Sequence, residues 1–250
     1  MTRLLQTTLI VLVATLGAAP VAFAQVGTLG GRGFILVNGG YQMATHDVEQ
    51  ASTLRANVED GSFTTDYEVK SGPSFDVAGG ANIWRRLGAS VGVTRFSRST
   101  PSTLTGSVPH PFFFNRPRSV SGDIAGLKRE ELAIHVEAIA TAPIGRRLQV
   151  MAFGGPSFFR VKQDMVTTFT WAETYPFDDA SFGSATTVDA DGSKLGFNVG
   201  ADVGYFFTRQ VGVGGTIRFA RATVEMDVAG GTQKAKAGGL QAGGGLRLRF

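Results

Sequence analysis

The amino-acid sequence predicts an all-β fold, an eight-stranded antiparallel up-and-down transmembrane β-barrel. The first observation behind this prediction is period-2 alternation of side-chain character, which runs through the segment from Ala237 to Phe250 and is the pattern of a strand. The second is that eight such segments occur, with lengths close to the roughly 9–11 residues that cross a bilayer on a tilt. The third is that long and short connections alternate between them, as in barrels with short turns on one side and long loops on the other.

The first 24 residues have the features of an export signal. Arg3 gives a short positive region, the stretch from Leu4 to Val21 is mostly apolar, and Ala22-Phe23-Ala24 has the form of a cleavage site. We therefore expect residues 1–24 to be a cleaved signal peptide and residues 25–250 to form the barrel domain. A retained membrane anchor is the alternative. The chain contains no Cys, so neither a lipid-carrying cysteine nor a disulfide framework is expected.

The composition narrows the class of function. The formal net charge is +4 at pH 7 and the pI is about 9.6, but no stripe of Lys and Arg with interleaved aromatic residues appears. Nucleic-acid binding is therefore not expected. The chain has 34 Gly residues and little helical periodicity, and both features suit a tightly curved β-sheet. Beyond the signal peptide, no window approaches the roughly 18 apolar residues of a membrane-spanning helix.

Eight strands are expected, each with two distinct faces. Their approximate residue ranges are 32–44, 75–84, 89–94, 131–140, 148–161, 195–205, 211–219 and 237–250. Three tight turns join them in pairs, and each turn carries arginine: Arg85-Arg86-Leu87, Pro143 to Arg147, and Thr208-Arg209-Gln210. Aromatic residues near these turns are expected to form one girdle at the membrane surface. They are Phe34, Trp84, Phe206, Phe207 and Phe250.

The other connections are expected to be loops on the opposite side. They are residues 45–73, 97–128 and 162–192, which are long, and 225–236, which is short. The segment 97–128 contains Pro101, Pro109, Pro111 and Pro117, and proline cannot donate to a ladder. We therefore expect it not to form a ladder strand.

The polar face of the strands carries charges of both signs. We predict an interior charge cluster composed of Asp76, Glu131, Glu137, Asp202, Arg218, Arg247 and Arg249. Buried charges need partners, so the cluster is expected to be a structural plug, with gating of a conducting path as the alternative. A soluble lipocalin-like barrel would instead place apolar residues inside. The export signal, the aromatic girdle and the terminal Phe250 favour the membrane barrel.

The final strand places Leu246, Leu248 and Phe250 on one face, and this pattern resembles the C-terminal sorting strand of bacterial outer-membrane β-barrels. The chain after residue 24 resembles the small eight-stranded outer-membrane proteins of the OmpA transmembrane domain, OmpX and OmpW type. The resemblance implies a monomer in the bacterial outer membrane, in contact with outer-membrane lipid and lipopolysaccharide and inserted by the barrel-assembly machinery. It also implies a narrow interior filled by charged side chains, and no catalytic residues.

No catalytic site, metal site or cofactor is expected. Gly88 to Gly92 fits a G-x-S-x-G pattern but lies inside a strand, whereas a nucleophile elbow needs a strand–turn–helix context. His46, His110 and His135 share no metal or triad spacing. A lipid-modifying enzyme is a third class, which the interior position of His135 argues against. The segment Thr170 to Asp179 carries acids suited to Ca²⁺. Asp189 to Ser193 lacks the full spacing of a calcium loop and is expected to be a turn.

Two loops carry candidates for contacts with other molecules. These residues are Phe112, Phe113, Phe114, Arg116, Arg118, Trp171 and Tyr175. They are expected either to pack on the barrel rim and lipid interface, or to contact lipopolysaccharide, an extracellular ligand or another envelope protein. The leading function is therefore a structural or surface-interaction protein of the envelope. The alternative is a narrow channel for small or apolar solutes.

Overall fold

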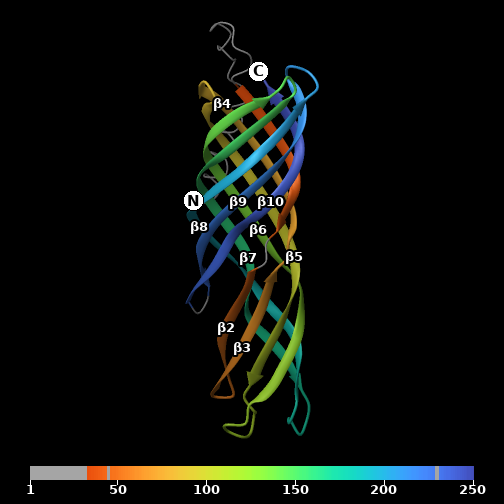
Figure 1. Ribbon diagram of the computed structural model, residues 1–250. Helices are drawn as coiled ribbons and strands as arrows, with labels where there is room; N and C mark the ends of the chain where they lie inside the picture. The colour runs from red at the N-terminus through yellow and green to blue at the C-terminus, as the bar shows by residue number, and fades with distance from the viewer. Residues whose placement is uncertain (1–32, 44–45, 229–230) are drawn as a thin grey trace, which may run out of the picture. The chain divides into compact units, whose positions relative to one another are not determined.

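The computed structural model describes residues 33–43, 46–228 and 231–250. The expected signal peptide, residues 1–24, lies outside the described residues. The described chain forms ten β-strands (Figure 1), with the following bounds: β1 Gly33–Met43, β2 His46–Ala56, β3 Glu59–Val69, β4 Gly72–Trp84, β5 Leu87–Val108, β6 Arg118–Ile144, β7 Leu148–Glu173, β8 Ala180–Phe206, β9 Val211–Val228 and β10 Gly231–Arg249. Among these residues, no helix is long and apolar enough to cross a membrane.

Eight of the strands close into a ring. The order around it is β5-β4-β1-β10-β9-β8-β7-β6, every pairing is antiparallel, and β6 pairs back onto β5. The first and last strands meet along a seam that runs from Phe34 opposite Arg249 to Met43 opposite Leu240. Gly245 lies on this seam, where a Cβ would approach the Val37 carbonyl oxygen to 1.8 Å. The predicted eight-stranded antiparallel barrel is therefore confirmed, and its closure removes the open sheet edges from the ring.

The expected long loops are strands, and this part of the prediction is wrong. Residues 46–69 form the β2–β3 hairpin, and β3 pairs through Ser62–Asp66 with Thr103–Ser107 of β5. Residues 97–128 and 162–192 belong mostly to β5, β6, β7 and β8, of which the last three are 26 or 27 residues long. Residues 225–236 are likewise mostly strand. Pro101 fits the ladder because the pairing of β5 with β6 shifts register between Thr100 and Ser102, and a bulge tolerates a residue without an N–H.

In the segments that the sequence predicted as strands, the outer face is apolar and the inner face is largely polar. Large apolar side chains are exposed around this part of the ring: Ile35, Phe75, Val77, Val91, Val93, Val136, Phe158, Phe197, Val199, Val203, Val213, Ile217, Leu246 and Leu248. We call this surface the apolar band. Asn38, His135 and Asp202 are buried behind it. This arrangement is the reverse of a lipocalin-like barrel, whose interior is apolar.

The aromatic girdle is only partly as expected. Trp84, Phe207 and Phe250 are exposed, but Phe34 and Phe206 are buried. Alternation along β1 and β8 turns these two rings inward. Phe34 belongs to a small buried apolar cluster with Leu36, Ala78, Ile139, Met151 and Phe153. The assignment of Phe34 and Phe206 to the girdle is therefore wrong.

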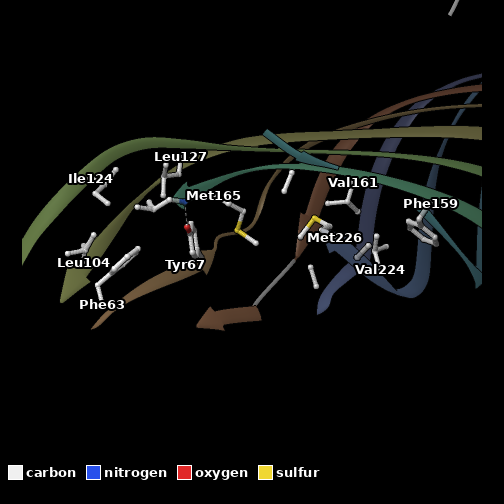
Figure 2. Packing of buried hydrophobic residues seen from close by; sticks show 14 of the residues in the cluster. Phe63, Tyr67, Leu104, Ile124, Leu127, Phe159, Val161, Met165, Val224 and Met226 are labelled. Atoms are coloured by element: carbon white, nitrogen blue, oxygen red, sulfur yellow. Dashed lines mark hydrogen bonds between the residues drawn. The ribbon is translucent and has the colours of Figure 1, made fainter. Parts of the chain in front are cut away.

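Beyond the apolar band, the pattern inverts. The continuations of β5 to β10, together with the β2–β3 hairpin, enclose a buried apolar cluster, part of which is drawn in Figure 2. We call this region the extension. Its core includes Phe63, Leu104, Met165, Phe169 and Met226. Outward positions such as Ser62, Asp66, Thr103 and Thr105 are exposed and polar. The barrel wall thus continues past the apolar band as a structure with its own apolar core.

Tyr67 joins three strands of the extension. Its hydroxyl donates to Gln50 Oε1 at 2.7 Å and accepts the N–H of Val166 at 2.8 Å, and Gln50 Nε2 donates to the Val166 carbonyl at 3.0 Å. Burial raises the pKa of Tyr67 to about 12. A phenol whose pKa is raised by folding stabilises the fold below its unfolded pKa of about 10, and that contribution is lost as the pH rises toward about 12.

We expect one of the four tyrosines to titrate near pH 12 when phenolate absorbance is followed. The Tyr67→Phe variant should lose that step and should lower the stability of the extension by about 1–3 kcal/mol, because Gln50 Oε1 and the Val166 N–H each lose the hydroxyl as a partner. Its stability should then be flat between pH 10 and pH 12, whereas that of the wild type falls. An unchanged titration curve in the variant would contradict the assignment.

Candidate functional site

Arg218 of β9 is the centre of the barrel interior. Its Nη1 donates to Asp76 Oδ2 at 2.5 Å and to Thr94 Oγ1 at 2.9 Å, and its Nη2 donates to Glu137 Oε1 at 3.1 Å. The guanidinium carbon lies 5.0 Å from the ring centre of Phe153. Both carboxylates and the arginine are buried. One cation is therefore paired with two acids, from β4 and β6. The sequence pattern predicted that these acids lie on the inner face, but not which cation they contact.

A second buried arginine is linked to the first. Arg247 is 1% exposed, and its Nε donates to Asp202 Oδ1 at 3.0 Å while its Nη2 also bonds to that carboxylate. Its Nη1 donates to Asn38 Oδ1 at 2.6 Å, and Asn38 Nδ2 donates to Asp76 Oδ1 at 3.0 Å. Five of the seven predicted cluster residues are thus connected in one network, which we call the interior network.

His135 extends the interior network across the barrel. One ring nitrogen lies 3.0 Å from Thr94 Oγ1 and the other lies 2.7 Å from Ser157 Oγ. Asn198 Nδ2 donates to the same Ser157 oxygen at 2.9 Å. The imidazole is fully enclosed by these partners, so its placement is that of a structural connector between β5, β6, β7 and β8.

Glu131 lies in a separate layer. It accepts from Arg129 Nε at 2.8 Å, from Gln42 Nε2 at 3.1 Å and from the Gly238 N–H at 2.9 Å. Arg129 also donates to Gln163 at 2.6 Å. The prediction that Glu131 belongs with the other interior charges is therefore wrong, because its cation is Arg129, two residues away on the same face of β6. Sequence reasoning missed Arg129, although the alternation of β6 turns both residues inward.

Arg249 also lies outside the interior network. It is half-buried at the end of β10, where its guanidinium stacks 3.9 Å from the ring centre of Phe206 and donates to the Arg209 carbonyl at 2.5 Å. Within the described ranges it forms no ion pair. Its inclusion in the cluster is wrong because the strand carries it past the level of the acids.

The interior network leaves little space. A cavity of about 10 Å³ adjoins Asp76, Arg218 and Gln241, which is about the volume needed for one water molecule. Arg247, His135 and Gln42 are among the largest fully enclosed side chains of the described chain. Opposed charges and amides therefore occupy the cross-section of the barrel.

The second candidate site is where three hairpin tips meet at the end of the extension. Arg118 Nη2 donates to the Pro109 carbonyl at 2.8 Å, Nη1 donates to the Phe177 carbonyl at 3.0 Å, and Nη2 lies 2.6 Å from Glu173 Oε2. Arg118 is only 5% exposed. It was predicted as a contact residue, and this is wrong, because it braces the β5–β6 tip against the β7–β8 tip.

The β2–β3 tip is attached to the same place. Asn57 Nδ2 donates to the Pro109 carbonyl at 3.3 Å, and Glu59 Oε1 accepts the N–H of Asn115 at 2.9 Å. Arg116 pairs with Asp178 at 3.3 Å across the other two tips. The three tips are therefore tied together by polar contacts.

The aromatic contact candidates divide into two groups. Phe112, Phe113, Phe114 and Tyr175 are between 55% and 82% exposed. Trp171 is instead partly buried against the extension core, with its ring centre 5.7 Å from that of Phe169. It therefore contributes to packing, which was the first of the two alternatives.

His110 holds the β5–β6 tip in shape. Its Nδ1 accepts the N–H of Phe112 at 3.1 Å and that of Phe113 at 3.2 Å, and its ring packs on Phe113 with centres 4.9 Å apart. We expect His110→Ala to raise amide hydrogen exchange at these two positions by about 5- to 30-fold, because a hydrogen bond contributes about 1–2 kcal/mol. His110→Asn should restore part of the protection because its side-chain oxygen accepts similar bonds. Equal exchange in wild type and H110A would contradict this role.

The expected acidic features do not gather into a metal site. Across the described residues, no group of three or more His, Asp or Glu side chains is placed to hold a metal ion. Glu173 and Asp178, two acids of the segment considered for Ca²⁺, are paired with Arg118 and Arg116. Leu246, Leu248 and Phe250, which the sequence predicted as a sorting signal, are all exposed.

No family model and no curated protein matches this chain. Among solved structures, it is similar to small outer-membrane β-barrels, the class that the sequence resembles. Neisserial surface protein A is 13% identical, with a TM-score of 0.43, and the match covers 87% of this chain and 97% of that one.

Two further structures show similar coverage. The N-terminal β-barrel domain of Pseudomonas aeruginosa OprF is 10% identical with a TM-score of 0.34, covering 89% of this chain and 100% of that one. Ail, the attachment invasion locus protein of Yersinia pestis, solved with the heparin analogue sucrose octasulfate, is 8% identical with a TM-score of 0.36, covering 87% and 99%.

Proposed function

We propose that the protein is an outer-membrane β-barrel of the bacterial envelope with a structural or surface-interaction role. In this proposal the apolar band anchors it, the interior network closes it, and the extension presents the hairpin tips outside the membrane. The observation that carries the proposal is that the apolar and polar faces of the barrel wall exchange sides between the apolar band and the extension. A polar interior behind an apolar outer face suits lipid, and an apolar core beneath a polar outer face suits water.

The length of the strands supports the division into two parts. A strand needs about 9–11 residues to cross a bilayer on a tilt, whereas β6 has 27 residues. More than half of β6 therefore extends beyond the hydrocarbon. Outward charges begin where the apolar band ends, including Arg95 paired with Glu130 and Arg160 paired with Asp191.

We propose outer-membrane lipid around the apolar band and lipopolysaccharide phosphates at the outward cations as surrounding partners. Arg221 and Lys236 are exposed at this level on neighbouring strands, and Arg and Lys are suited to bind phosphate. Insertion would use the barrel-assembly machinery, for which the exposed face of β10 is the proposed signal. The protein would act as a monomer, since the closed ring needs no second copy to complete it.

The rival function is a narrow channel. The largely polar lining behind the apolar band favours it, but the small cavity beside Arg218 disfavours it. Planar-bilayer recording of the refolded protein separates the two. We expect no steady conductance from barrels whose folding is verified by a heat-dependent shift on gels. Steady conductance that changes in Glu137→Gln would instead support the channel.

Display at the cell surface can be tested with single cysteines, because the chain has none of its own. We expect a membrane-impermeant thiol reagent to label Phe114→Cys in intact cells. Arg86→Cys, in the turn between β4 and β5, should be labelled only after the cells are opened. The opposite labelling pattern, or equal labelling of both, would contradict the proposed orientation.

A further inference from the structure

We propose that the hairpin tips insert into the surface of an electrically neutral lipid membrane that faces the membrane holding the barrel. We call the inserting side chains the aromatic tip: Val58, Phe112, Phe113, Phe114 and Tyr175. This inference rests on the proposed function and names the partner of the working surface. It assigns the protein a membrane-apposing activity.

The exposure of the aromatic tip is the first argument. Val58 is 78% exposed, Phe114 73% and Tyr175 82%. Side chains this exposed project from turns and do not line a groove, so a second protein would have to supply the whole concave surface. A lipid interface accepts projecting apolar side chains without a matching shape, and aromatic rings suit that depth.

The backbone of the tip is the second argument. An N–H or C=O group that enters an apolar phase must have an internal partner. The N–H groups of Phe112 and Phe113 donate to His110, and the N–H of Asn115 donates to Glu59. The Pro109 carbonyl accepts from Arg118 and from Asn57.

Proline strengthens this argument. Pro109, Pro111 and Pro117 have no N–H to satisfy. An ordinary water-exposed loop needs none of these devices, because water satisfies its backbone. The N–H groups of Phe112, Phe113 and Asn115 and the Pro109 carbonyl therefore keep their partners when the tip leaves water, and they add no cost of unpaired polar groups.

Charge indicates which lipid is suited. Two exposed cations lie at the tip. Arg116 is neutralised by Asp178 at 3.3 Å and stacks 5.6 Å from the ring centre of Phe113, and Arg55 lies opposite Asp60 in the β2–β3 ladder. Asp60 and Asp179 are exposed nearby. The charges of the tip would therefore not attract anionic headgroups, and a zwitterionic surface is preferred.

The position and stiffness of the tip complete the argument. Along β5, the β5–β6 tip lies at the end opposite the turn at Arg85. The extension core lies between this tip and that turn. Buried Arg118 fixes the tip on that core, so little freedom remains to be lost on insertion. The rings are therefore held away from the membrane that contains the apolar band.

The test uses the full barrel held in a nanodisc and mixed with phosphatidylcholine vesicles, which are then floated on a density gradient. We expect the wild type to float with the vesicles and the F112S/F113S/F114S variant to bind at least 10-fold less. Val188→Ser is the matched control, because Val188 is 53% exposed on β8 away from the tip, and it should float like wild type. A heat-dependent gel shift verifies that each variant is a folded barrel.

Three results would overturn the inference. They are wild-type protein that stays with the nanodisc fraction, a triple serine variant that floats like wild type, and flotation that requires phosphatidylglycerol in the vesicles. A second readout follows insertion directly: in a Trp84→Phe/Trp171→Phe background, Phe114→Trp should be quenched by brominated lipid present in the added vesicles alone. Unquenched fluorescence in a floating sample would count against insertion.

Failure of this inference differs from failure of the proposed function. Absent flotation together with surface labelling of Phe114→Cys would remove the lipid partner and leave the surface role. Flotation without surface labelling in cells would leave the lipid affinity and remove the envelope orientation.

Discussion

Arg218→Met is expected to lower the free energy of unfolding by about 3–5 kcal/mol, the range for a buried ion pair that loses one partner. Arg218 serves Asp76 and Glu137 together, so its removal leaves two buried carboxylates without a cation. Met fills a similar volume, so the loss is mainly electrostatic. Denaturant unfolding in phospholipid vesicles, followed by the fluorescence of Trp84 and Trp171, measures it.

Two controls isolate the buried charge. Arg95→Met removes the cation of an exposed pair, 3.4 Å from Glu130, and should cost no more than about 1 kcal/mol. The D76N/E137Q/R218M variant removes the stranded charges and should recover most of the loss. If the triple variant is as unstable as R218M, packing and not charge explains the effect.

Phe63→Ala is expected to destabilise the extension by about 3–5 kcal/mol, the range for a buried aromatic side chain that is truncated. Phe63 is 2% exposed and its ring meets that of Phe169 edge-on, with centres 5.3 Å apart. Because the core of the extension is separate from the buried apolar cluster near Phe34, the loss should be local. Proteolysis of β2–β3 and faster amide exchange there should report it.

The matched control is Phe114→Ala, the same substitution at an exposed ring, which should leave protection of β2–β3 unchanged. The unfolding midpoint of the barrel within the apolar band should also stay unchanged in Phe63→Ala. An equal fall of that midpoint would show that the barrel and the extension unfold as one cooperative unit.

The barrel was predictable because its strands follow a simple rule. Apolar and polar side chains alternate cleanly between an outward face and a charged interior, as Val199 and Asp202 do on β8. The extension was missed because its outward residues are short polar ones that also suit loops. Its signal was present: Phe63 and Tyr67 are buried on alternate positions of β3, with Asp66 exposed between them.

The sites were less predictable than the fold, because side-chain partners come from distant parts of the chain. Alternation places Arg218 and Arg249 on inner faces, but it does not give the position of either residue along the barrel axis. It therefore could not show that Arg218 lies at the centre and Arg249 at the end. Arg118 looked like a loop cation, but it is buried, and its partners are Glu173 and the Phe177 carbonyl. No local pattern distinguishes such a brace from a surface charge.

The seam between β1 and β10 governs how the chain reaches this structure. Phe34 lies opposite Arg249, so the pairs that close the ring join the most distant parts of the described chain. Such pairs form late, because the chain loses conformational entropy when the two strands are brought together, before the hydrogen bonds of the ladder compensate for that loss. Until then β1 and β10 each present an open edge to neighbouring chains. Aggregation is therefore a hazard of the time before closure, and it ends when the last strand is in register.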